Sequence, residues 1–175
     1  MADLSLTVRE WLTAGSDSPE LAETTGWLEI RTGDTCLTRH VDIWSRTVRD
    51  AVLVSAYPLA CWFAWYWWRL SYEPLPGKTP PFSWSMAHEL GAAGHGYVWP
   101  RVLFASDGEA VQVWAESLAM PNQSVQYLLG LQEPRNVPLA AFQSAVDEFV
   151  RAVLDRLAAV GFSNTDLSAL WARVK

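Results

Sequence analysis

Two stretches of alternating apolar and polar residues predict β-hairpins. Apolar and polar side chains alternate from Leu28 to Arg31, and the Thr-Gly-Asp that follows is typical of a turn, so we expect a hairpin over 26–41. A second hairpin is expected over 102–114, where Asp107-Gly108 separates two apolar runs, the strongest short signal for a hairpin turn. A further strand is expected at 124–129.

The segment 42–70 predicts one long helix, or two helices joined at Pro58. Asp42 or Ser45 is a candidate cap, since a short polar side chain there accepts a hydrogen bond from the first helical turn. Proline lacks a backbone donor, so Pro58 is expected to kink or break the helix near 55–57.

Three further helices are predicted after this segment. A short one is expected over 82–93, beginning at Ser83 or Ser85. Residues 138–160 repeat apolar side chains at three- and four-residue steps, which predicts an amphipathic helix capped near Asn136 and ended by Gly161. A last helix is expected over 165–174, where Ser163 and Asp166 have the spacing of a capping box.

These elements indicate an α+β fold: an antiparallel sheet of two hairpins plus a strand, packed on a long central apolar helix and a C-terminal amphipathic helix. We expect a single domain over 1–175, with 1–25 a loosely packed extension and 163–175 a short terminal helix. Within the extension, apolar residues between Leu4 and Leu12 fit a strand or a short helix. The final residues lie inside a helical pattern, which fits a chain cut from a longer protein.

Residues 51–68 run for eighteen positions without a charge, which is long enough to raise the question of a membrane span. Pro58 interrupts the run, and Trp62 would lie near the middle of the bilayer, although tryptophan prefers the interface. We therefore expect a buried core helix, with a membrane span over 51–68 or a helix on the membrane surface as the alternatives.

Net charge and composition narrow the classes of partner. A formal net charge of −6 argues against nucleic-acid binding by bulk electrostatics. Charged residues make up only 18% of the chain, and the chain contains eleven tryptophans. We therefore expect a protein partner or an attached domain to cover part of the surface. Cys36 and Cys61 are expected to be small buried side chains, and the N-terminus has no signal-peptide pattern, which indicates a cytoplasmic protein.

One group of residues suggests metal chemistry. His88 and Glu89 are adjacent, as in zinc peptidases, but the next histidine, His95, is seven residues from His88 rather than four, across two glycines. These residues keep one alternative function open: a metal-dependent hydrolase that binds zinc through His88 and His95, with Glu89 as its base. Our main expectation is that the chain has no catalytic residue, metal or cofactor.

Tryptophans beside arginine suggest a binding surface or a small-molecule pocket, because aromatic rings and guanidinium groups stack on ligands. The candidate contact residues are Trp62, Trp65, Trp68, Arg69, Trp84 and Trp99.

Several segments resemble the N-terminal region of larger bacterial proteins whose C-terminal part is an ImmA/IrrE-type zinc metallopeptidase domain. They are 45–60, 67–70 with Tyr72-Glu73-Pro74, 86–93 continuing to Trp99-Pro100, and 104–108, and the resemblance covers most of 40–160. The zinc motif of those proteins lies downstream, and this chain has no His-Glu-x-x-His, so peptidase activity does not carry over. The resemblance implies a sensing or docking domain in stress response or phage defence. We therefore expect a non-catalytic domain that binds a protein or ligand and regulates an attached or partner enzyme.

Overall fold

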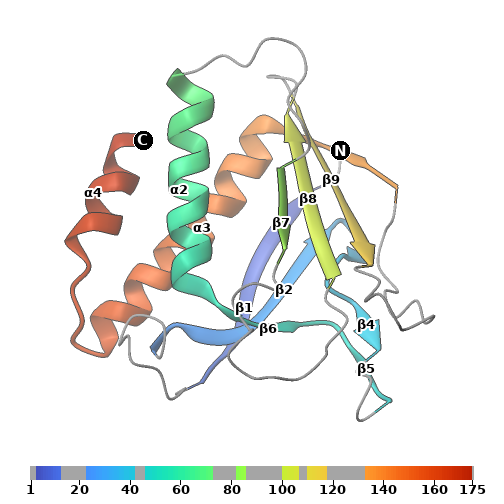
Figure 1. Cartoon of the computed structure of the whole chain (residues 1–175), viewed down its shortest axis with the longest axis horizontal. Coiled ribbons are helices and arrows are strands. Elements are labelled where there is room, and N and C mark those ends of the chain that lie inside the picture. Colours follow the sequence, from blue (N-terminus) through green and yellow to red (C-terminus); the bar gives the residue numbers. More distant parts are fainter. Residues whose placement is uncertain are drawn as a thin grey trace.

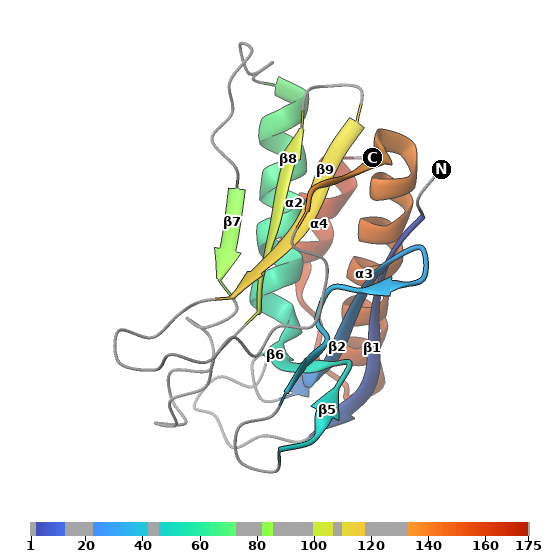
Figure 2. The ribbon, with the colours of Figure 1, turned by 90° about the vertical axis from the view of Figure 1, so that its right-hand side faces the viewer.

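Helices form one layer of the molecule and strands form the other (Figure 1). The computed structural model describes residues 3–12, 23–41, 46–72, 82–85, 100–106, 110–117 and 133–174. Viewed from the side of the strands, the sheets lie in front of the helices (Figure 2). The predicted α+β class is confirmed, and the two predicted hairpins lie in two separate antiparallel sheets.

The N-terminal sheet consists of β1 (Leu4–Leu12), β2 (Thr25–Thr32), β3 (Thr35–Cys36) and β6 (Val52–Ser55). The central strand β2 pairs with β1 along its whole length on one side. On the other side, β6 pairs with the start of β2 and β3 with its end. Gly33 closes the β2–β3 turn at a φ of +57°, which glycine adopts without strain. Residues 4–12 are thus a strand, one of the two predicted alternatives.

The C-terminal sheet has the strand order β10 (Arg135–Pro138), β9 (Ala110–Ser117), β8 (Pro100–Ser106) and β7 (Phe82–Ser85). Strands β8 and β9 form the predicted second hairpin, although its Asp107-Gly108 turn lies outside the described residues. A small third sheet joins β4 (His40–Val41) to β5 (Val48–Arg49). The predicted strand at 124–129 also lies outside the described residues.

Two predicted helical segments are strands instead. Residues 48–49 and 52–55 pair in sheets, so the helix predicted from residue 42 begins only at Ala56. Asp42 and Ser45, its predicted caps, lie outside the described residues. Residues 82–85, predicted to begin a helix, pair with β8. In both cases tertiary strand pairing overrides the local pattern.

Helix α2 (Ala56–Tyr72) runs through Pro58, and the predicted kink is wrong because of where the helix begins. Pro58 lies in the first turn, where a backbone N–H has no partner within the helix, so proline costs no hydrogen bond. Two backbone donors of this turn bind a residue that is distant in the sequence. The backbone N–H of Ala56 donates to the Thr24 carbonyl (2.8 Å), and that of Tyr57 donates to the Thr24 hydroxyl (3.2 Å).

Helices α3 (Leu139–Ala159) and α4 (Thr165–Val174) confirm the two predicted C-terminal helices, but their caps differ from the prediction. Pro138 precedes α3 without a side-chain cap, because Asn136 is paired in β10. Asn164 caps α4 by accepting the backbone N–H of Leu167 at 2.6 Å. Gly161 follows α3 at a φ of +75°, as its predicted role at the helix end requires.

One hydrophobic core joins both sheets to all three described helices. At its centre, Phe63 of α2 lies 5.7 to 6.2 Å from three other phenylalanine rings in near edge-to-face geometry, namely Phe104, Phe142 and Phe149. The second part of the apolar run 51–68 is therefore the buried helix that was predicted, while its first part is strand β6. None of the described helices has both the length and the apolar character that crossing a bilayer requires.

Candidate functional site

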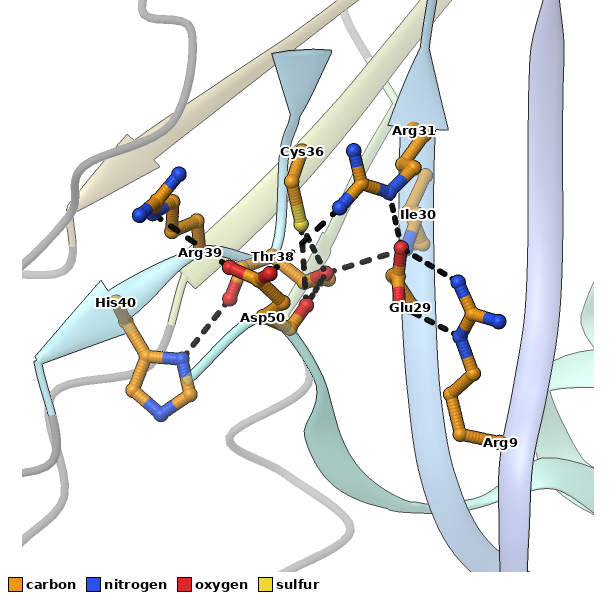
Figure 3. Close-up of polar contacts among 9 residues, drawn as sticks. All are labelled: Arg9, Glu29, Ile30, Arg31, Cys36, Thr38, Arg39, His40 and Asp50. Carbon is orange, nitrogen blue, oxygen red and sulfur yellow. Dashed lines mark hydrogen bonds and ion pairs between the residues drawn. The ribbon is translucent and has the colours of Figure 1, made fainter. Parts of the chain in front are cut away.

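The polar side chains of β2 lie on the face of the N-terminal sheet that is turned away from the helices. Leu28 and Ile30 are buried in the core, so Glu29 and Arg31, which alternate with them, face the opposite side. We call this side the outer face. It carries a continuous chain of alternating opposite charges, the charge ladder, which is defined by Arg9, Glu29, Arg31, Asp50 and Arg39 (Figure 3).

Glu29 is the buried carboxylate of the ladder, and the residue is only 5% exposed. Arg9, from β1, donates from Nε and Nη2 to the two carboxylate oxygens of Glu29, at 2.7 and 3.0 Å. Arg31, two residues along β2, donates from Nε to the same carboxylate. These bonds hold the pKa of Glu29 below its usual value, and the bond from Arg9 has the largest effect. Burial of the carboxylate opposes the shift. Glu29 in turn raises the pKa values of both arginines.

The bulge in β1 explains how Arg9 reaches this carboxylate. Pairing with β2 shifts register between Val8 and Glu10, so Arg9 is the extra residue on its strand. A bulge of this kind redirects the side chain of the unpaired residue. Gly26 of β2 is required nearby, since a Cβ there would lie 2.7 Å from the Glu10 carbonyl oxygen and 2.8 Å from a Val8 methyl.

Asp50 extends the ladder to a second arginine. Its carboxylate lies 3.6 Å from Arg31 Nη2 and 3.5 Å from Arg39 Nε, so it joins these two guanidinium groups. Both distances are long for hydrogen bonds, and the buried Oδ1 of Asp50 has no hydrogen-bond partner among the residues that the structure describes. The Arg39 end of the ladder is therefore held less tightly than the Arg9 end.

The Thr38 hydroxyl fixes the segment that carries Asp50. It accepts the backbone N–H of Ile30 (3.1 Å) and donates to the Asp50 carbonyl (2.6 Å). The Cys36 thiol donates to the same carbonyl, with its sulfur 3.1 Å away. Burial raises the pKa of this thiol, which favours the protonated form that donates this bond. His40 is similarly engaged, because its Nδ1 donates to the Thr38 carbonyl at 2.9 Å.

One aromatic side chain on β2 extends the outer face beyond the ladder. Trp27 is half-buried two residues before Glu29, and the Arg49 guanidinium lies 5.1 Å from the centre of its ring. This is a cation–π distance. Glu10 is opposite Trp27 in the strand register and is exposed. The described part of the outer face therefore combines arginines, the Trp27 ring and carboxylates, which is a composition suited to recognition.

Of the six predicted contact residues, only Trp62 has a described side chain, and it does not lie on the outer face. Trp62 packs on the core, 4.9 Å from the ring of Phe63 and 6.4 Å from that of Phe104. The side chains of Trp65, Trp68, Arg69 and Trp84 lie outside the description, although their backbones belong to α2 and β7. Trp99 lies outside it entirely, so a tryptophan-lined pocket stays a prediction.

His88, Glu89 and His95 also lie outside the described residues, and the zinc-hydrolase alternative stays a prediction. Within the described part of the chain, no group of three or more histidine, cysteine, aspartate or glutamate residues is placed to hold a metal ion. Cys36 is buried, as expected, whereas Cys61 is half-buried, and neither forms a disulfide within the described part of the chain.

Sequence reasoning missed the ladder, although part of its signal was visible. Glu29 and Arg31 share one face of a correctly predicted strand, which places their charges side by side. Arg9 and Asp50 come from other elements, and Asp50 was expected in a helix.

A scan of the chain against protein-family models finds no match, and searches among curated proteins and solved structures find none either.

Proposed function

We propose that this chain is a non-catalytic recognition domain whose contact surface is the outer face of the N-terminal sheet. The charge ladder carries the proposal: a buried carboxylate holds two guanidinium groups in place, and the exposed parts of these groups face solvent. Arginine and tryptophan are the side chains most enriched at the energetic centres of protein interfaces.

The electrostatics of the ladder favour binding over catalysis. A general base needs a pKa near the working pH, whereas two arginines hold the pKa of Glu29 below its ordinary value. A nucleophilic cysteine needs a lowered pKa, whereas burial raises that of Cys36. These side chains order the surface and leave the arginines to meet a partner.

The partner in this proposal is a protein whose activity the domain regulates, or an attached domain of a longer chain. The resemblance to regions preceding ImmA/IrrE-type peptidase domains supports this role, and with it a place in bacterial stress response or phage defence. The low share of charged residues, 18%, supports a surface that a partner covers.

Affinity capture from extracts of the source organism tests the proposal. The bait is the wild-type chain, the ladder variant Arg9→Gln/Arg39→Gln, or the control variant Arg135→Gln/Arg173→Gln, which removes the same charge from exposed positions elsewhere. We expect a protein that wild type and control retain and the ladder variant loses. Equal retention by all three would overturn the choice of surface, and no retained protein would overturn the recognition role.

A further inference from the structure

We infer that the charge ladder binds an acidic protein segment, with Arg9 and Arg39 contacting its carboxylates and Glu29 acting as a positioning residue. This inference rests on the proposed function and deepens it by assigning the chemistry of the partner. It follows from the exposure of the ladder charges, the free edges of its guanidinium groups and the role of the buried carboxylate.

The exposed charge of the ladder is positive, although the chain is acidic. The ladder has three arginines and two carboxylates, which leaves one positive charge on it against a net −6 for the chain. The arginine side chains are exposed, 57% for Arg9 and 52% for Arg39, whereas the side chain of Glu29 is 7% exposed and that of Asp50 is 43% exposed. At the Arg9–Glu29 end of the ladder, an approaching partner therefore meets the guanidinium group before the carboxylate, which favours a negatively charged segment there.

The guanidinium groups keep unused donors. Arg9 binds Glu29 through Nε and Nη2, which leaves Nη1 without a partner among the described residues. Arg39 approaches Asp50 most closely through Nε, and its Nη atoms make no hydrogen bond to the described residues. A guanidinium edge matches a carboxylate with two parallel hydrogen bonds, a pairing that lysine does not reproduce.

Glu29 explains why Arg9 is ready to bind. An arginine on a surface normally samples many rotamers, and ordering it on binding costs entropy. The three hydrogen bonds to Glu29 fix Arg9 and Arg31 before any partner arrives. Removing Glu29 therefore has opposite consequences under two explanations: bulk charge predicts tighter binding of an anion, whereas loss of positioning predicts weaker binding.

Fluorescence anisotropy with labelled poly-L-glutamate tests the inference on the full chain. We expect Arg9→Gln/Arg39→Gln to raise the dissociation constant about tenfold, and Arg135→Gln/Arg173→Gln to change it less than about twofold. Raising salt from about 50 to 300 mM should weaken wild-type binding, because exposed charges are screened. Equal losses in both double variants would mean nonspecific attraction and would overturn the inference.

Two single variants separate positioning from charge. Glu29→Gln is expected to weaken binding although it removes a negative charge, and tighter binding would overturn the positioning role. Arg9→Lys keeps the charge at a half-exposed position that does not threaten folding, and we expect it to weaken binding about threefold or more through loss of the planar edge. An unchanged affinity for Arg9→Lys would refute the carboxylate contact.

Failure of this inference is distinguishable from failure of the proposed function. If the ladder variant loses its captured protein but wild type does not bind poly-L-glutamate, the recognition surface stands and its acidic ligand is wrong. Binding of single-stranded polynucleotide more tightly than poly-L-glutamate would also overturn the choice of an acidic protein segment.

Discussion

Replacing the buried carboxylate of the ladder should measurably destabilise the fold. Glu29→Gln preserves shape but removes the charge and leaves one acceptor oxygen for the three N–H groups that now bind Glu29. Breaking a fully buried ion pair costs about 3–5 kcal/mol. Arg9 is 57% exposed and can turn to water, so the loss is smaller, and we expect about 2 kcal/mol in the free energy of unfolding.

The pH dependence identifies the cause of this loss. The pKa of Glu29 is lowered in the folded state, so its contribution to stability is present above the pKa of an unfolded glutamate, about 4.3. The contribution is lost as pH falls through the folded-state pKa. The difference between wild type and Glu29→Gln should therefore be complete at neutral pH and narrow at acidic pH.

Urea unfolding of both proteins, followed by circular dichroism between about pH 7 and pH 3.5, measures this difference. Glu148→Gln is the matched control, because Glu148 is exposed on α3, and its cost should stay below about 0.5 kcal/mol. A cost for Glu29→Gln no larger than that of the control would refute the reasoning. A difference that stays constant as pH falls would refute its electrostatic origin.

Three further substitutions test the elements that support the ladder. Phe63→Ala should lower the free energy of unfolding by about 4 kcal/mol, because it leaves a cavity among three phenylalanine rings. The control Val48→Ala, at an exposed position, should lower it by less than about 0.5 kcal/mol. Similar unfolding midpoints in urea for the two variants would contradict this. Gly26→Ala should cost about 2 kcal/mol, because its Cβ collides with the backbone of β1, and a neutral result in thermal unfolding would refute the close approach. Thr38→Val should cost about 2 kcal/mol and speed hydrogen exchange at the Ile30 amide, and unchanged exchange there would argue against the bond.

Elements with a strong local period were predictable from the sequence. The first hairpin alternates with a period of two, and α3 buries Phe142, Val146, Phe149 and Val153 as its repeat predicted. The same helix carries an i, i+4 ion pair between Arg151 and Asp147, with a distance of 2.7 Å. In these segments the local pattern and the tertiary contacts agree.

Strand β6 was missed because its burial removes the alternating signal. Val52, Val54 and Ser55 are all buried, and Leu53 is half-buried, so the strand reads as part of one apolar run that continues into α2. Once the start of the helix was assigned too early, Pro58 was placed in its interior and a kink was expected. A short apolar run does not distinguish strand from helix without knowledge of its pairing partner.

The ladder was out of reach for a related reason. Its five charged residues lie on four separate stretches of the chain, and two of its contacts depend on the bulge in β1 and on the turn held by Thr38. Neither feature leaves a regular spacing in the sequence. Only Glu29 and Arg31, two residues apart on one strand, were close enough to be found by periodicity.

Stability alone does not account for a carboxylate at this position. An apolar side chain of similar volume often replaces a buried ion pair without loss, so Glu29→Met should recover most of the stability that Glu29→Gln loses. It should not recover poly-L-glutamate binding, because methionine holds neither arginine in place. If Glu29→Met restores the free energy of unfolding but binds as weakly as Glu29→Gln, the carboxylate serves the surface. If it restores both, Glu29 is a packing residue and the ladder has no positioning role.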